Sequence, residues 1–411
     1  MQYGLLGERL GHSFSPQIHK ELGGYEYELC PTAPEDVAAF MQGRNFKGLN
    51  VTIPYKKTVI PYCDMLTDRA KSVGAVNTLY FDDDRLVGEN TDYFGFSAMA
   101  ARAGISFMDK RVIILGSGGA SATAQTVARD EGAARIAVIS RTKGCGYGDL
   151  PGFSDWDIIV NTTPVGMFPD NYGRAVDLGI FTNLCGVIDV VYNPLRTQLI
   201  LDAEDRGIKC AGGLYMLVAQ AKRAAEIFSR KIISQQRLDE VFGKIENSVT
   251  NIVLIGMPGC GKSSIARRLS ERLGREVVDT DAVIVEESGM SIPDIFAKCG
   301  EAGFRDLETQ AIKKCAAKSG IILATGGGSI LREENRRALR QNGRIFMIDR
   351  SLDRLQMRNG RPLSKDRVSV ERLYSERDGI YRALADGIID NNGSISDAAE
   401  AIVQKMNQIG R

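Results

Sequence analysis

The sequence predicts an α/β protein with two separate parallel sheets. Two strand-like runs, RVIIL (111–115) and NIVLI (251–255), each lead into a glycine-rich turn and then a helical stretch. Short apolar runs alternate with helical stretches after each of them, which is typical of parallel α/β units. The length of 411 residues is enough for two to four domains at roughly 100–200 residues per domain.

The composition is that of an ordinary globular protein, with 44% hydrophobic and 25% charged residues. A formal net charge of +1 gives no sign of a nucleic-acid or membrane partner. The eight cysteines are scattered singly, as free thiols of a reducing compartment are. The N-terminal stretch lacks the basic and apolar regions of a secretory signal, and no run is long enough to span a membrane. We therefore expect a cytoplasmic protein.

The expected elements follow one another in a simple order. Residues 1–92 contain short β-like runs separated by turns: YEYELC, GLNVTIP, AVNTLYF and DRLVGE. A helix at about 93–104 leads to strand 111–115, a helix at 120–131 and strands at 135–139, 157–161 and 186–192. A long helix is expected from about 214 to 242. The short polar segment 243–250 is interpreted as a compact connection to the second unit, so that the domains are 1–246 and 247–411.

The most specific motif is GMPGCGKS (256–263), which matches G-x-x-x-x-G-K-[ST] in full between a strand and a helix. Backbone amides of such a P-loop surround phosphates, Lys262 reaches the β- and γ-phosphates, and Ser263 binds Mg²⁺. The sequence therefore predicts that 247–411 is a P-loop domain that binds ATP and Mg²⁺. The residues expected at the nucleotide are Gly256, Gly259, Cys260, Gly261, Lys262, Ser263 and Ser264.

The second glycine-rich turn, GSGGAS (116–121), is a weaker signal, because Ser121 stands where a dinucleotide fingerprint has its third glycine. Arg141 and Lys143, which follow the next strand at 135–139, strengthen the dinucleotide signal. A basic residue at this place suits the 2′-phosphate of NADP, whereas a carboxylate would suit NAD. We therefore expect a Rossmann-type NADP-binding part over about 93–212. Its cofactor residues are Gly116, Gly118, Gly119, Ala120, Ser140, Arg141, Thr142 and Lys143.

The motifs that follow the P-loop resemble those of shikimate kinase, in order, over nearly all of 249–411. They are Asp279-Thr280-Asp281, SIPDIFAKCGEAGFRDLE (291–308), Thr325-Gly326-Gly327-Gly328, GRPLS (360–364) and Tyr381-Arg382. The resemblance implies that Asp281 meets the reacting hydroxyl of shikimate and that Asp279 holds Mg²⁺ through water. It also implies a lid carrying Arg361, although the stretch before Arg361 is short and Arg358 shares the role in one reading. The other implied substrate residues are Phe296, Arg305, Gly327 and Arg382.

The chemistry of these residue types agrees with that resemblance. Forked guanidinium groups hold a carboxylate better than lysine does. A carboxylate beside the attacking hydroxyl orients it and accepts its proton.

The first half resembles shikimate dehydrogenase over about 1–242. The motifs are GHSFSPQIHK (11–20), GLNVTIPYKK (48–57), GAVNTL (74–79), GENTDYFG (88–95), NTTPVGM (161–167), DVVYNP (189–194) and GGLYMLVAQA (212–221). The resemblance implies that Lys56 and Asp92 form the acid–base pair and that Gly213 and Met216 approach the nicotinamide. It also implies that about 1–92 and 213–242 form the substrate-binding part. The residues implied to line the shikimate site are Ser13, Ser15, Asn50, Thr52, Lys56, Asn77, Asp92, Tyr192 and Gln220.

Together the two resemblances predict a bifunctional enzyme. It reduces 3-dehydroshikimate with NADPH and phosphorylates the resulting shikimate with ATP. The chain has only His12 and His19, and two ligands do not complete a metal site. Two alternatives stay open: a first half that prefers quinate or NAD, and a non-catalytic metabolite-sensing regulator.

Overall fold

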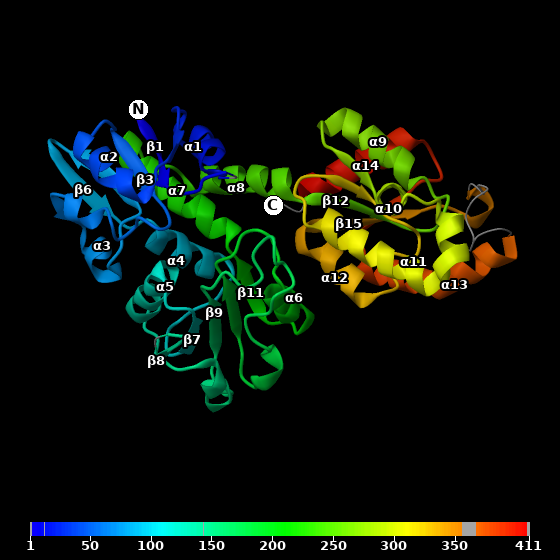
Figure 1. The fold of residues 1–411 in the computed structure, drawn as a ribbon, viewed down its shortest axis with the longest axis horizontal. Coiled ribbons are helices and arrows are strands. Elements are labelled where there is room, and N and C mark those ends of the chain that lie inside the picture. Colours follow the sequence, from blue (N-terminus) through cyan, green and yellow to red (C-terminus); the bar gives the residue numbers. More distant parts are fainter. Residues whose placement is uncertain (1, 12, 143, 356–366, 409–411) are drawn as a thin grey trace. The chain divides into compact units, whose positions relative to one another are not determined.

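The fold is described from a computed structural model that covers residues 2–11, 13–142, 144–355 and 367–408. The chain forms two compact units. Unit 1 comprises Met1–Asn193 and Thr197–Ile245, and unit 2 comprises Pro194–Arg196 and Glu246–Arg411. Each unit has its own sheets and apolar core, so each is described by itself (Figure 1).

The first sheet of unit 1 has six strands in the order β2-β1-β3-β5-β6-β4. β1 pairs in parallel with β2 and β3, whereas β5 is antiparallel to β3 and β6. The turn between β5 and β6 places Asp83 at φ 52°, a left-handed conformation that Asp tolerates. The strands are Tyr3–Gly7 (β1), Glu28–Pro31 (β2), Gly48–Val51 (β3), Met65–Leu66 (β4), Thr78–Asp82 (β5) and Arg85–Glu89 (β6), and the accompanying helices are Ser15–Gly23 (α1), Val37–Gly43 (α2) and Asp68–Val73 (α3).

Strand β1 was not among the strands expected from the sequence. It reads YGLLG, with two glycines and no β-branched residue, so its intrinsic strand preference is low. Its place between β2 and β3 makes it a strand, because there Leu5 and Leu6 are buried in the core. Tertiary packing therefore decides this element.

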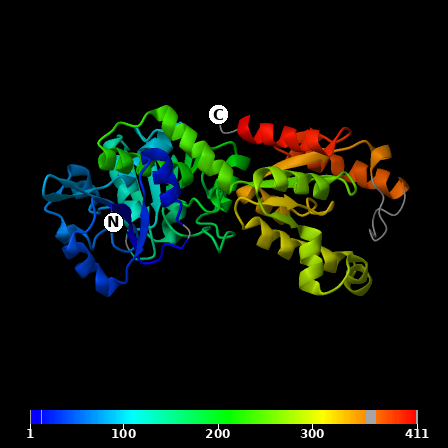
Figure 2. The ribbon, with the colours of Figure 1, turned by 90° about the horizontal axis from the view of Figure 1, so that it is seen from above.

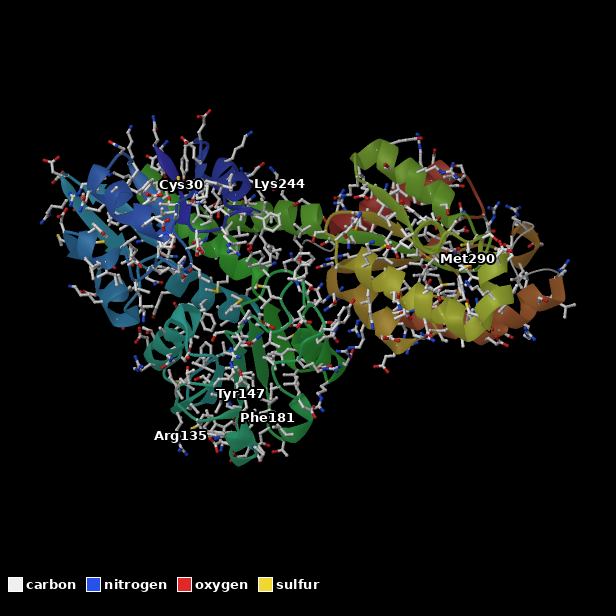
Figure 3. The ribbon with its side chains drawn as sticks, viewed as in Figure 1. Cys30, Arg135, Tyr147, Phe181, Lys244 and Met290 are labelled. Carbon is white, nitrogen blue, oxygen red and sulfur yellow. The ribbon has the colours of Figure 1, made fainter. Side chains whose placement is uncertain are left out.

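The second sheet of unit 1 is fully parallel, as expected, in the order β11-β10-β9-β7-β8. The order reverses between β7 and β9, and open α/β sheets bind ligands at the carboxyl ends of strands at such a point. Tyr147 and Phe181 belong to the apolar cluster packed on this sheet (Figure 3). The strands are Arg111–Leu115 (β7), Arg135–Ile139 (β8), Ile158–Asn161 (β9), Gly186–Asp189 (β10) and Lys209–Gly212 (β11), and the helices are Gly119–Asp130 (α5) and Gln198–Asp205 (α6).

Helices Asp92–Arg102 (α4) and Leu214–Ser229 (α7) approach closely at Gly95, where a Cβ would lie 2.6 Å from the Met216 carbonyl oxygen. The expected single helix over 214–242 is in fact two helices, because Arg230 adopts φ 54° and ends α7. The second helix, Gln235–Val249 (α8), extends past the expected helix end at 242 and includes most of the segment expected to be a compact connection. Apolar side chains continue at helical spacing through it, with Val241, Ile245 and Val249 buried, so helical packing extends through this segment.

Unit 2 contains one fully parallel sheet in the order β13-β14-β12-β15-β16, which confirms the predicted parallel P-loop fold. Helices α9 and α14 cover one face, and α11 and α12 cover the other (Figures 1 and 2). The strands are Asn251–Ile255 (β12), Val277–Asp279 (β13), Ile322–Ala324 (β14), Gly343–Asp349 (β15) and Gly387–Asp390 (β16). The helices are Lys262–Leu273 (α9), Thr280–Ser288 (α10), Ile292–Ala316 (α11), Glu333–Asn342 (α12), Arg367–Leu384 (α13) and Ile395–Gln408 (α14).

No helix in the described part of the chain is both long and apolar enough to cross a membrane.

Candidate functional sites

The first glycine-rich turn lies at the carboxyl end of β7, where the strand order reverses. Gly116 has φ +105°, and a Cβ there would come within 2.7 Å of the Thr162 hydroxyl, so glycine is required. A Cβ on Gly118 or Gly119, at the start of α5, would meet nothing within 4 Å. This open space in front of a helix N-terminus, with Ala120 in its first turn, suits a diphosphate because free amides and the helix dipole attract anions.

A short loop after β8 holds the residues expected to select NADP. The amide of Ser140 donates to the Cys145 carbonyl oxygen at 2.9 Å, and the Ser140 hydroxyl accepts from the Thr142 amide at 3.3 Å. Arg141 is exposed between them, as a residue that meets a ligand phosphate must be. Lys143 lies outside the described residues.

Lys56 and Asp92, the expected acid–base pair, are in direct contact. Lys56 Nζ lies 2.5 Å from Asp92 Oδ2, and the two side chains are only 25% and 13% exposed. Asp92 is the first residue of α4, and Lys56 lies in the loop after β3. The close packing of α4 on α7 at Gly95 brings the Asp92 end of α4 near Gln220. In this partly desolvated position the pair interacts more strongly than it would in water.

A buried network of amides and hydroxyls connects the remaining substrate candidates. Asn50 Oδ1 accepts from the Tyr27 hydroxyl at 2.7 Å, and Asn50 Nδ2 donates to Thr78 Oγ1 at 2.9 Å. Asn77 Oδ1 accepts from the Thr91 amide at 2.7 Å, and the Thr91 hydroxyl donates to Gln220 Oε1 at 3.3 Å. The network thus joins β3, β5 and α7, and it ends one residue before Asp92. Tyr27 and Thr91 are residues that the sequence analysis missed, because a buried hydroxyl leaves no local pattern.

Other candidates from unit 1 occupy different positions around these residues. Ser13 Oγ accepts from the Ser15 amide at 3.2 Å, and Phe14 between them faces the ring of Tyr192, with centroids 6.2 Å apart. Thr52 directly follows β3. A Cβ on Gly213 would lie 2.1 Å from the Val190 carbonyl oxygen, so backbone packing alone requires glycine there.

His19 has a structural environment. It is buried, its ring stacks on Tyr27 with centroids 4.0 Å apart, and Nδ1 lies 2.7 Å from the Tyr25 hydroxyl. Desolvation lowers the pKa of His19 to about 3, so the imidazole is neutral at physiological pH. His12 lies outside the described residues, and within them no group of three or more His, Cys, Asp or Glu side chains could hold a metal.

The P-loop of unit 2 is a tight turn between β12 and α9. Gly256, Gly259 and Gly261 all have positive φ angles, which only glycine adopts easily. Lys262 Nζ donates to the carbonyl oxygens of Gly256 and Met257 at 2.8 and 3.0 Å, so the ammonium group lies over the loop itself. Asn391 Nδ2 donates to the carbonyl oxygen of Cys260 at 2.7 Å and fixes the far side of the turn.

Two side chains with oxygen atoms that can ligate a metal, Ser263 and Asp279, lie where a Mg²⁺ ion is expected. Ser263 Oγ donates to Asp279 Oδ2 at 2.9 Å, and Asp279 Oδ1 accepts from the amide of Asp281. One hydroxyl and one carboxylate, completed by water and phosphate oxygens, are a donor set that Mg²⁺ uses. Ser264, the remaining P-loop candidate, lies next along α9.

The substrate candidates of unit 2 surround the Gly326–Gly328 turn after β14. A Cβ on Gly326 would lie 2.6 Å from Asp281 Oδ1, and one on Gly328 would lie 2.2 Å from Arg305 Nη1. Arg305 is buried and donates to Glu308 Oε2 at 2.7 Å. These glycines let an acid and a guanidinium approach the same turn. Phe296 packs on Phe304, the residue before Arg305, with ring centroids 4.7 Å apart.

The structure places two arginines of α13 in different environments. Arg382, the expected second carboxylate-binding arginine, is 40% exposed and pairs with Asp378 and Asp349. Arg377, one turn earlier on α13, is buried and donates to the Gly327 carbonyl oxygen at 3.1 Å, where the Tyr381 hydroxyl also donates. The spacing of Arg377 four residues before Tyr381 was the available signal, because such residues share a helix face. Arg358 and Arg361 lie outside the described residues.

A dinucleotide-type turn on one parallel sheet and a P-loop on another define a nucleotide-dependent enzyme with two sites. Comparisons with known proteins identify both halves. Residues 5–79 match the family model described as shikimate dehydrogenase substrate binding domain, and residues 258–407 match the one described as shikimate kinase.

Relatives and solved structures agree for the first half. The NADP(+) shikimate dehydrogenase of Clostridium perfringens (strain 13 / Type A) is 33% identical over 265 residues, covering 59% of this chain and 98% of the relative. A chorismate mutase/shikimate 5-dehydrogenase fusion protein from Clostridium acetobutylicum is 35% identical, with a TM-score of 0.56 over 59% of this chain and 96% of that one. The Thermus thermophilus enzyme, solved with NADP(H) and shikimate, is 27% identical, with a TM-score of 0.54 over 59% of this chain and 99% of its own.

The chain belongs to the shikimate dehydrogenase family, and its second unit carries a shikimate kinase domain. Both family predictions made from the sequence are confirmed.

Proposed function

We propose that this chain catalyses two consecutive steps: NADPH-dependent reduction of 3-dehydroshikimate to shikimate, and phosphorylation of shikimate by ATP to shikimate 3-phosphate. The observation that carries the proposal is that two unrelated sites on one chain belong to families that share one metabolite. A cytoplasmic location belongs to the same proposal.

In unit 1, the chain's residues place the ketone and supply its proton. Bound NADPH supplies the hydride, and the open turn before α5 together with Arg141 fits its phosphates. Lys56 Nζ, held by Asp92, donates the proton to the oxygen on which charge develops. The buried network that ends at Gln220 keeps the hydroxyl-binding groups in fixed orientations, which lowers the entropy cost of reaching the reactive geometry.

In unit 2, Asp281 orients the attacking hydroxyl of shikimate and accepts its proton. Arg305 and Arg377 hold the carboxylate from two sides of the glycine turn. Lys262 turns from the loop carbonyl oxygens to the nucleotide phosphates. Ser263 and Asp279 would hold Mg²⁺, which would neutralise part of the phosphate charge.

Selective inactivation tests the proposal. Lys56→Met keeps a side chain of similar length but removes the proton donor, so it should abolish ketone reduction and leave phosphorylation of added shikimate intact. Asp281→Asn should have the opposite effect, and each loss should be about 10²–10⁴-fold in rate. Loss of both activities in a folded single variant would refute the two-site proposal.

A second assay addresses specificity. Rates are measured for shikimate and quinate, each with NADP⁺ and with NAD⁺. The proposal requires the shikimate and NADP⁺ pairing to be fastest, and a faster quinate or NAD⁺ reaction would replace it.

A further inference from the structure

An arginine beside the P-loop has no role in the functions described above. Arg350 directly follows β15, the strand that pairs with the P-loop strand β12. The two are packed so closely that a Cβ on Gly256 would lie 2.7 Å from the carbonyl oxygen of Ile348. At the other end of the loop, a Cβ on Gly261 would lie 3.9 Å from Arg350 Nη1. The guanidinium therefore lies next to the glycine that precedes Lys262.

Arg350 lacks the partners that its neighbours have. Its Nε is buried and has no hydrogen-bond partner within the described ranges. The two acids at the carboxyl ends of β15 and β16 have other partners: Asp349 pairs with Arg382, and Asp390 accepts from the amide and side chain of Asn392. A desolvated guanidinium nitrogen without an acceptor is unfavourable, and a bound anion would remove that cost.

Two other side chains on this side of the loop donate hydrogen bonds to the loop itself. Asn391 Nδ2 donates to Cys260, and Lys262 donates to two loop carbonyl oxygens. These bonds hold the loop in shape. Arg350 contributes nothing comparable to the shape of the loop, so its charge is available for a ligand.

We propose that Arg350 is a further nucleotide-binding residue of the kinase unit, whose guanidinium binds a phosphate oxygen of the ATP held by the P-loop. This inference rests on the proposed kinase function, because it requires a nucleotide in that loop. Arginine suits the role, since its fork donates two parallel hydrogen bonds to phosphate oxygens.

The test compares Arg350→Gln with Arg268→Gln in the full chain. Arg268 is a matched control, because it is an exposed arginine of unit 2 that pairs only with Glu271 on its own helix, among the described residues. Titration calorimetry measures binding of ADP and of adenosine, and steady-state kinetics give the KM values for ATP and shikimate. For Arg350→Gln we expect a rise of about tenfold in the Kd of ADP and the KM of ATP, with the KM of shikimate and adenosine binding unchanged. The control should change none of these.

Several outcomes would overturn the inference. Unchanged ADP binding in Arg350→Gln would show that the guanidinium does not contact the nucleotide. Equal weakening of ADP and adenosine would place the contact at the base rather than at a phosphate. A lowered unfolding temperature would indicate a structural role, because the substitution removes no hydrogen bond of the Arg350 Nε within the described ranges and should leave that temperature unchanged. If the unaltered chain does not bind ADP, the proposed kinase function itself fails. Failure of that function is thereby distinguished from failure of the Arg350 inference alone.

Discussion

The assignment of the shikimate carboxylate to Arg377 gives the sharpest test of the kinase site, because α13 carries its own control. Arg377 and Arg382 lie on one helix, five positions apart. Arg377 is buried at the glycine turn, whereas Arg382 is 40% exposed and forms two ion pairs. Arg377→Gln and Arg382→Gln are therefore the same chemical change in two different environments.

The different environments of the two arginines predict different effects of the two substitutions on the KM for shikimate. A hydrogen bond to a charged partner contributes about 1.5–3 kcal/mol, so Arg377→Gln should raise the KM for shikimate about 10–150-fold. Exposed ion pairs contribute only about 0–1 kcal/mol, so Arg382→Gln should change that KM by less than about fivefold. Neither should change the KM for ATP, because among the described residues neither side chain forms a hydrogen bond or ion pair with the P-loop.

The assay follows ADP release at varied shikimate and saturating ATP. Ketone reduction in unit 1 controls for the amount of intact chain in each preparation, and the unchanged KM for ATP controls for the folding of unit 2. A large KM effect from Arg382→Gln together with none from Arg377→Gln would refute the reasoning and restore the assignment made from sequence.

Three further predictions concern unit 1. Thr91→Val should lower kcat/KM for 3-dehydroshikimate about tenfold, because it removes the hydroxyl that hydrogen-bonds to Gln220 and Asn77. Thr91→Ser keeps the hydroxyl and should keep near-normal rates. Equal losses in the two variants would contradict a role for this hydrogen-bond network. Arg141→Ala should weaken NADPH binding by about 1.5–3 kcal/mol and NADH binding little, and equal losses in fluorescence titrations would make Arg141 structural. Burial raises the pKa of Asp189 from 3.8 to about 6, so its contribution to the unfolding free energy is fully present below pH 3.8 and is lost as the pH rises through 6. Urea unfolding at pH 3.5 and at pH 7 measures this loss, which is roughly 3 kcal/mol of unfolding free energy and should be absent in Asp189→Asn. If the difference in unfolding free energy between the variant and the unaltered chain is the same at both pH values, the prediction is contradicted.

Local signals were sufficient for the parts of the fold that generate the nucleotide sites. The strands RVIIL and NIVLI are rich in apolar and β-branched residues, and each is followed directly by a glycine, Gly116 or Gly256, whose positive φ angle disfavours a side chain. Strand, turn and helix are local consequences of such sequences, so their positions could be predicted.

Features that depend on distant contacts could not be predicted in the same way. β1 is a strand because two other strands enclose it, and α8 continues through a polar segment because its apolar side chains remain buried. Arg377 and Arg382 look alike in sequence, and only the packing of α13 on the Gly327 turn distinguishes them. The unpaired state of the Arg350 Nε likewise depends on groups from separate strands, among the residues that the structure describes.

The central claim is that one chain makes shikimate and then phosphorylates it. The most direct measurement supplies the purified chain with 3-dehydroshikimate, NADPH, ATP and Mg²⁺ and follows NADPH loss and ADP release together. The account predicts that both occur, and that ADP release stops when NADPH is omitted and returns when shikimate is added. ADP release that does not depend on NADPH or shikimate, or NADPH loss without any ADP release, would contradict it.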